Sequence, residues 1–282
     1  MGLFKNAAEA AREAFKLKQA RAIDLFGDGD EVYHWVAAEH LPNKVARGFS
    51  PFTHVGTKKA AEELFDIREG RYDKTNLMGA TLPLRFNRKK DILDVEKDIG
   101  AHSALGVMWQ VAPYLYGNRE SAIGSPLVQR TLDSVVRSMT DREVNAIANE
   151  IIQEGYVPYN GTDMSQWLRK ALESMPDTFE ETQSGIMVKN RSRDADMIGR
   201  QTLANELEKF NVGALQYTNN VEDVGSKSYM IVQPHDIRSR FANYDPGEWR
   251  RRSKNIMAAV PAVAGAGGLL AMSKRDKQKA DA

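Results

Sequence analysis

The chain of 282 residues contains no cysteine, and this absence excludes several kinds of chemistry. Disulfide bridges, thiolate nucleophiles, zinc-finger sites and iron–sulfur clusters all need cysteine side chains. The five histidines show no HExxH or comparable ligand spacing. They are His34, His40, His54, His102 and His235. Cysteines and suitably spaced histidines are the usual ligands of a bound transition metal, so we predict that the protein has no metal site.

The sequence also lacks an excess of charge of either sign. Lys and Arg number 39, Asp and Glu number 38, and the formal net charge is +1. A general nucleic-acid binder would carry a basic surplus for phosphate contacts, so we predict no sequence-specific nucleic-acid partner. The first residues contain no apolar signal core, so secretion by the ordinary route is not expected. With 42% hydrophobic residues, the chain can form one sizeable core or two small ones.

Residues 1–24 are predicted to form an amphipathic N-terminal helix. Apolar side chains recur there at steps of three and four, with charged residues between them. They are Phe4, Ala8, Ala11 and Phe15. Such a helix can dock on its own domain, on a neighbouring subunit or on a membrane surface, and these alternatives stay open.

The C-terminal tail, residues 247–282, changes character along its length. A basic stretch at 250–254 is followed by the uncharged, small-residue-rich segment Ile256–Met272. About 20 apolar residues are needed to span a bilayer, and Pro261 weakens a single helix. A flexible or partner-docked tail, insertion into a host membrane and burial in a core all stay open for this segment.

Hydrophobic patterning between these ends predicts an α+β fold. We expect strands at 31–36, before Thr57, and at 79–86, 214–218 and 228–233. We expect helices at 58–66, 101–117, 127–137, 141–155, 164–174 and 200–209, and an exposed loop at 175–200. Thr57 and Asp141 are the expected N-caps of the helices that follow them, and Gly155 the expected end of its helix. Pro83 predicts that strand 79–86 is an edge or bulged strand.

Three separated stretches carry a resemblance, and they occur in the same order as in the family they resemble. The first is Gln19-Ala-Arg-Ala-Ile-Asp-Leu-Phe-Gly, followed by Glu31-Val-Tyr-His34. The second is Phe52-Thr-His-Val-Gly-Thr57. The third and most specific runs from Gly213 through Glu222 to the sequence Ser-Tyr-Met-Ile-Val-Gln-Pro and then Ile-Arg-Ser. Together they resemble the ADP-ribosyltransferase-like domain of polyvalent phage and prophage proteins that are delivered with the virion.

The resemblance implies a fold and a set of functional residues. The implied fold is a small, split, mostly antiparallel sheet over residues 25–246, with a helical insertion at about 101–199 and helical termini. If the domain is active, the implied catalytic residues are Glu222, as the essential carboxylate, and His34, which would hold a ribose. The implied residues that bind the cofactor NAD are Tyr33, Thr57 and Tyr217.

The family's Tyr-His-Gly pattern is altered at Trp35, where the family usually has glycine. Glycine lets the backbone approach the dinucleotide closely, and an indole could block that approach. Strand alternation, however, would send Trp35 to the sheet face opposite His34. The residues therefore leave enzymatic activity open.

Two hypotheses follow from the resemblance. In the first, the protein is a structural or ejected virion protein with a degenerate domain. It would act in the virion and in the host cell after delivery, and its partners would be other virion proteins, including portal or tail components, and copies of itself. In the second, it is an active NAD-dependent mono-ADP-ribosyltransferase delivered into the host. A soluble early phage protein that blocks host defence is a third alternative, which no residue specifically favours.

Overall fold

The structure is a computed structural model that describes residues 31–37, 49–64, 79–95, 103–153, 155, 158, 163–174 and 183–239. The predicted helix at 1–24 and the tail at 247–282, with its segment Ile256–Met272, lie outside these residues. The chain divides into two compact units, and each is described by itself. Unit 1 comprises Met1–Phe49, Ala60–Lys89 and His235–Ala282, and unit 2 comprises Ser50–Lys59 and Lys90–Pro234.

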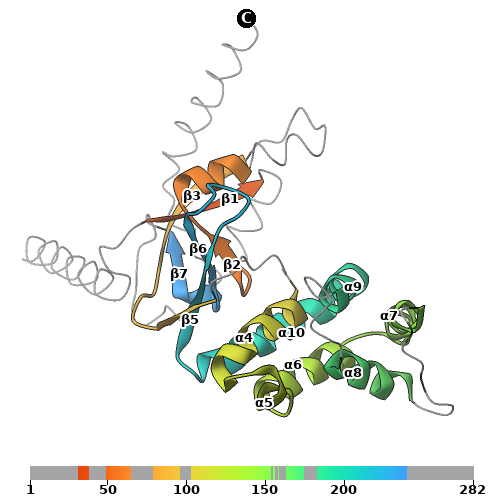
Figure 1. The fold of residues 1–282 in the computed structure, drawn as a ribbon. Helices are drawn as coiled ribbons and strands as arrows, with labels where there is room; N and C mark the ends of the chain where they lie inside the picture. The colour runs from red at the N-terminus through yellow and green to blue at the C-terminus, as the bar shows by residue number, and fades with distance from the viewer. Residues whose placement is uncertain are drawn as a thin grey trace, which may run out of the picture. The chain divides into compact units, whose positions relative to one another are not determined.

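Unit 1 contains a three-stranded antiparallel sheet (Figure 1). Its strands are β1 (Val32–Ala37), β3 (Gly79–Phe86) and β7 (Ile237–Ser239), in the order β1-β3-β7. The prediction that Pro83 marks an edge strand is wrong, because β3 lies between the other two. Within the described residues, β7 pairs with Leu84–Phe86, and Pro83 lies opposite Tyr33 of β1.

Unit 2 contains a four-stranded mixed sheet. Its strands are β2 (Thr53–Val55), β4 (Asp91–Asp94), β5 (Val212–Thr218) and β6 (Lys227–Ile231), in the order β2-β6-β5-β4. β4 runs parallel to β5, and the other neighbours are antiparallel. The protein is therefore mixed α+β, with one antiparallel and one mixed sheet.

Seven helices with described bounds belong to unit 2 (Figure 1). They are α4 (Ala104–Tyr116), α5 (Arg119–Ile123), α6 (Pro126–Arg137), α7 (Asp141–Gln153), α8 (Met164–Ser174), α9 (Gln183–Arg191) and α10 (Arg193–Glu208). A further helix covers residues 58–64, and a 3-10 turn, η2, spans Pro234–Asp236. Four of the predicted helices match α4, α6, α7 and α8 closely. Amphipathic periodicity is strong in α6, α7 and α8, whereas α4 is apolar and buried along most of its length.

Side-chain caps fix where several of these helices begin. Ser103, Asn118 and Ser125 each accept a hydrogen bond from a backbone N–H of the first turn. The prediction that Asp141 caps α7 is wrong. Thr140 is the cap: its Oγ1 accepts from the Glu143 N–H, and its own N–H donates to Glu143 Oε2.

The prediction of an exposed loop at 175–200 is wrong for residues 183–200, where the chain forms α9 and the start of α10. The inward side chains of α10 are small here, so the apolar periodicity that marks a helix is weak. Gly199 packs so closely on its neighbours that a Cβ atom would lie 2.4 Å from Val135 Cγ2 and 2.9 Å from Ala104 Cβ. The small residue is what permits this close approach of α10 to α6 and α4.

One hydrophobic core joins the helices of unit 2 to its sheet. Buried helix residues such as Leu105 and Leu132 belong to the same cluster as Leu215 of β5 and Met230 of β6. Phe52, just before β2, also belongs to it and is 1% exposed, although its φ of 60° lies in the left-handed region. The helical block predicted as an insertion thus shares its core with strands on both sides of it in sequence.

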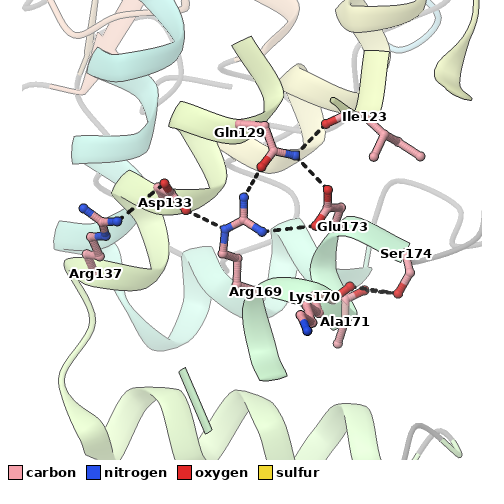
Figure 2. Close-up of polar contacts among 9 residues, drawn as sticks. All are labelled: Ile123, Gln129, Asp133, Arg137, Arg169, Lys170, Ala171, Glu173 and Ser174. Atoms are coloured by element: carbon pink, nitrogen blue, oxygen red, sulfur yellow. Dashed lines mark hydrogen bonds and ion pairs between the residues drawn. The ribbon is translucent and has the colours of Figure 1, made fainter. Parts of the chain in front are cut away.

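A polar network joins α6 and α8 at the surface of this helical block (Figure 2). The guanidinium of Arg169 donates to Asp133, Glu173 and Gln129. The Gln129 amide in turn donates to the Ile123 carbonyl and to Glu173. Each polar group of the network has a partner, so we assign it a structural role in positioning the two helices.

Candidate functional site

Unit 2 brings one predicted cofactor residue, Tyr217, against a histidine that we did not predict. The hydroxyl of Tyr217 on β5 and Nδ1 of His54 on β2 are 2.7 Å apart, with ring centroids 5.7 Å apart. The sheet register places His54 opposite Met230 and Met230 opposite Leu215, two residues from Tyr217. The two rings therefore share a sheet face and meet across β6. Tyr217 is 5% exposed and is largely a buried residue.

A second predicted residue, Thr57, is bonded to the loop between β5 and β6. Its hydroxyl donates to Asp223 Oδ2 at 2.6 Å, and Lys59 Nζ lies 2.9 Å from Asp223 Oδ1. Thr57 lies directly before helix 58–64, where an N-cap was predicted. Its hydroxyl hydrogen is used to hold the loop.

The loop over residues 219–226 has a fixed backbone. The side-chain oxygen of buried Asn219 accepts from the N–H groups of Val221 and Glu222, each at 3.0 Å. The Asn219 carbonyl accepts from Gly225 N–H, and the Asp223 φ of 44° completes the turn. These bonds replace solvent contacts of the backbone, so the positions of Glu222 and Asp223 are set by the fold.

The contacts of Asp223 also control its protonation. The hydrogen bond from Thr57, followed by that from Lys59, holds the pKa of the Asp223 carboxyl below its ordinary value. A hydrogen bond to the charged form stabilises that form, so the carboxylate is ionised throughout the neutral range.

Glu222, the predicted catalytic carboxylate, differs from its neighbour. It is half-buried, and its backbone N–H is bonded to Asn219. Within the described part of the chain, its carboxylate makes no hydrogen bond or ion pair. Sequence reasoning identified this loop but missed the role of Asp223 in it, and it missed Lys59 as a partner of Asp223 and His54 as the partner of Tyr217. These contacts join residues about 160 positions apart, and only the sheet order, with β2 beside β6, brings them together.

Unit 1 contains the other two predicted site residues, on adjacent positions of β1. Tyr33 donates its hydroxyl to Glu31 Oε2 at 2.9 Å and packs beside Trp35. His34 makes an edge-to-face contact with Phe49, with ring centroids 5.4 Å apart. Trp35 is 6% exposed and packs on Ala61, so its indole is used as core. Alternation places it on the sheet face opposite His34, as predicted.

The predicted residues therefore fall into two groups. Thr57, Tyr217 and Glu222 belong to unit 2, whereas Tyr33 and His34 belong to unit 1. The proposed partnership of His34 with Glu222 in one NAD site stays a prediction. Among the described residues there is no group of acids and histidines that could hold a metal ion. The same residues include no helix with the length and apolar character needed to cross a bilayer.

Comparisons of the chain with protein-family models, with curated proteins and with solved structures found no match. The likeness to ADP-ribosyltransferase-like domains thus continues to depend on the three stretches of sequence described above.

Proposed function

We propose that the protein is a bacteriophage virion-associated protein, structural or ejected, in which an ADP-ribosyltransferase-like domain serves as a binding scaffold and not as an enzyme. The observation that supports the loss of catalysis is the state of two residues expected to bind NAD. Tyr217 is buried and bonded to His54, and the Thr57 hydroxyl is bonded to Asp223.

Binding of a dinucleotide through these residues would require both contacts to break. The Thr57 bond joins a hydroxyl to an ionised carboxylate, which is among the stronger hydrogen bonds in proteins. Exposing the Tyr217 ring would remove apolar surface from the core that it shares with the helices. Both groups are therefore better suited to hold the sheet and its loop together than to receive a ligand.

The virion role is supported by the resemblance to proteins delivered with phage particles. The helical block, α4–α10, provides a large surface for other virion proteins, including portal or tail components, or for further copies of the chain. The proposal includes entry into the host cell after delivery, with Ile256–Met272 as the segment that would meet the host membrane.

Mass spectrometry of purified particles tests this proposal. The expected result is recovery of the chain at the copy number of a structural or internal protein, and retention after the particles are washed in high salt. Absence from particles that contain the other structural proteins would overturn the virion role.

A second candidate function, an active NAD-dependent mono-ADP-ribosyltransferase, is favoured by Glu222. Its backbone is held in place while its carboxylate has no partner within the described part of the chain, as a residue that acts on substrate requires. Labelled NAD and host lysate would be incubated with the protein, with a Glu222→Ala variant and with a Glu120→Ala control at an exposed acid of α5. Label transferred by the protein and the control but not by Glu222→Ala would replace the scaffold proposal with this one.

A further inference from the structure

The loop over residues 219–226 presents two large apolar side chains to solvent. Val221 is 53% exposed and Val224 is 75% exposed. Turns more often carry small or polar residues, whose side chains bond to water or to the nearby backbone. Because the backbone of this loop is fixed through Asn219, a partner that binds the valines has little further chain to order. We call Val221, Glu222 and Val224 the loop surface.

The outer side of α10 carries a second pair of exposed apolar side chains. Met197 and Ile198 are exposed at consecutive positions, whereas Gly199 next to them packs inward against α6. Within the described residues, seven large apolar side chains are exposed, and the two pairs account for four of them. Apolar residues that are scattered singly on a surface are ordinary, but grouped ones indicate a contact surface. We call Arg193, Met197 and Ile198 the α10 surface.

The charges around the two surfaces are complementary. The carboxylate of Glu222 makes no hydrogen bond or ion pair within the described part of the chain, and the same holds there for the exposed guanidinium of Arg193. Arg193 lies one helical turn before Met197, so its charge adjoins the apolar pair. The largely exposed ammonium of Lys59 lies beside the loop, and Asp194 is exposed in the first turn of α10. Each surface therefore offers a carboxylate and a cation that can pair with those of the other.

We propose that the loop surface of one copy binds the α10 surface of a second copy of this chain. The two valines then pack on the two apolar residues of α10, and Glu222 pairs with Arg193 at the edge of the contact. Both surfaces belong to unit 2, and they differ from each other, so every copy offers one of each. A heterologous contact of this kind extends into a ring or into an open chain of copies.

This inference rests on the proposed scaffold role, because it takes a further copy of the chain as the partner. Its test, however, uses the purified full chain and no phage particles. The contact is small, so we expect a dissociation constant on the order of 10–100 μM. Sedimentation velocity at concentrations on either side of that value measures the association.

Three variants each place a glutamate at an exposed apolar position. Val224→Glu alters the loop surface, Ile198→Glu alters the α10 surface, and Ile92→Glu on β4 is the matched control outside both surfaces. We expect the first two variants to raise the dissociation constant about tenfold or more, because each places a charge in an apolar contact. The control should associate as the native chain does. Thermal unfolding of each variant shows that it is folded.

A mixture of the two altered chains tests whether the contact is heterologous. Val224→Glu keeps an intact α10 surface, and Ile198→Glu keeps an intact loop surface. Together they should form a dimer that cannot grow further, although each alone stays monomeric. The ion pair is tested by exchanging its charges: Glu222→Arg and Arg193→Glu should each weaken the association, and the two changes in one chain should restore it.

A native chain that stays monomeric at the highest concentration would overturn the contact, and so would a mixture of the two variants that forms no dimer. Association that is lost in only one of the two variants would also overturn it, since the remaining surface would then bind elsewhere. These outcomes are distinct from those of the virion role. A monomeric chain found in particles would refute this contact alone, and self-association of a chain absent from particles would refute the virion role alone.

Discussion

The helices of unit 2 and the sheet of unit 1 differ in the polar partners that surround their buried charged side chains. In the helices, Asp196 bonds both the Ala104 N–H and Arg200, and Arg169 is surrounded by acceptors. In the sheet, Arg85 faces Arg238, and an Arg85 donor stays unbonded within the described residues. Matched charges are explained by stability. The unbonded Nε of Arg85 is not explained in this way.

The four-stranded sheet of unit 2 contains both a charged side chain with polar partners and one without. Asp223 is matched by Thr57 and Lys59, while its neighbour Glu222 has no side-chain partner within the described part. The comparison therefore predicts that substitutions in the helices change stability most. Substitutions in the sheets should change binding or local order more than global stability.

The largest effect is expected for Asp196→Ala in α10. The carboxylate is 4% exposed, and its loss leaves Arg200 and the first N–H of α4 without their partner. Removing one member of a buried pair costs about 3–5 kcal/mol. Denaturant unfolding should show this loss, with a smaller one for Asp196→Asn, which keeps an acceptor for Ala104. A loss below about 1 kcal/mol would mean that buried charge in the helices is not matched for stability.

Gly199→Ala should have the next largest effect. The added methyl group would overlap Val135 and Ala104, and overpacking of this kind costs about 1–3 kcal/mol. Gly124→Ala is the control, because nothing lies within 4 Å of the added atom and the backbone there is helical. Equal denaturation midpoints for the two variants would contradict the close contact between α10 and α6.

Asp223→Asn should act locally and in a pH-dependent way. The pKa of Asp223 is lower in the folded protein than in the unfolded chain. Its stabilising contribution is therefore present above about pH 4 and is lost as the pH falls through the folded value. Hydrogen exchange at the Gly225 N–H, which is bonded to Asn219, should be faster in the variant at pH 7. The difference should shrink as the native carboxyl is protonated, and a constant difference would exclude this cause.

The smallest effect is expected for Arg137→Ala on α6. Its side chain is 81% exposed, and its contact with Asp133 is 3.7 Å long. Pairs of this kind contribute about 0–1 kcal/mol. A larger change in the unfolding free energy would show that even the solvent-facing charges of the helices are matched for stability.

Sequence patterns predicted the fold wherever the apolar repeat is strong. The helices α6, α7 and α8 and the strand β3 were located to within a few residues. The start of α10 was missed because Ala195 and Gly199 face inward, and small side chains give little hydrophobic signal. The parallel pairing of β4 with β5 joins strands more than 110 residues apart, and no local pattern encodes such a pairing.

The candidate site was predicted less completely, for a related reason. The stretch containing Tyr217 and Glu222 was identified, but the contacts that determine their chemistry come from β2 and helix 58–64. His54 was noted in the sequence as a histidine without metal-ligand spacing and as part of the second stretch, with no role of its own, whereas the structure pairs it with a tyrosine. The residue type indicates which interactions a side chain can make. The order of the strands in the sheet determines which partner it contacts.

Phe52 combines a left-handed backbone with a fully packed ring, and this limits how position 52 can vary over evolution. Glycine would relieve the backbone but would empty the space that the ring fills, and other large apolar residues would fill the space but keep the unfavourable φ. Each single replacement therefore loses something that the present residue provides. In homologous chains with another residue at position 52, we expect further substitutions in the turn before β2 or in the core that contacts the ring. The substitution at position 52 and these changes should occur together.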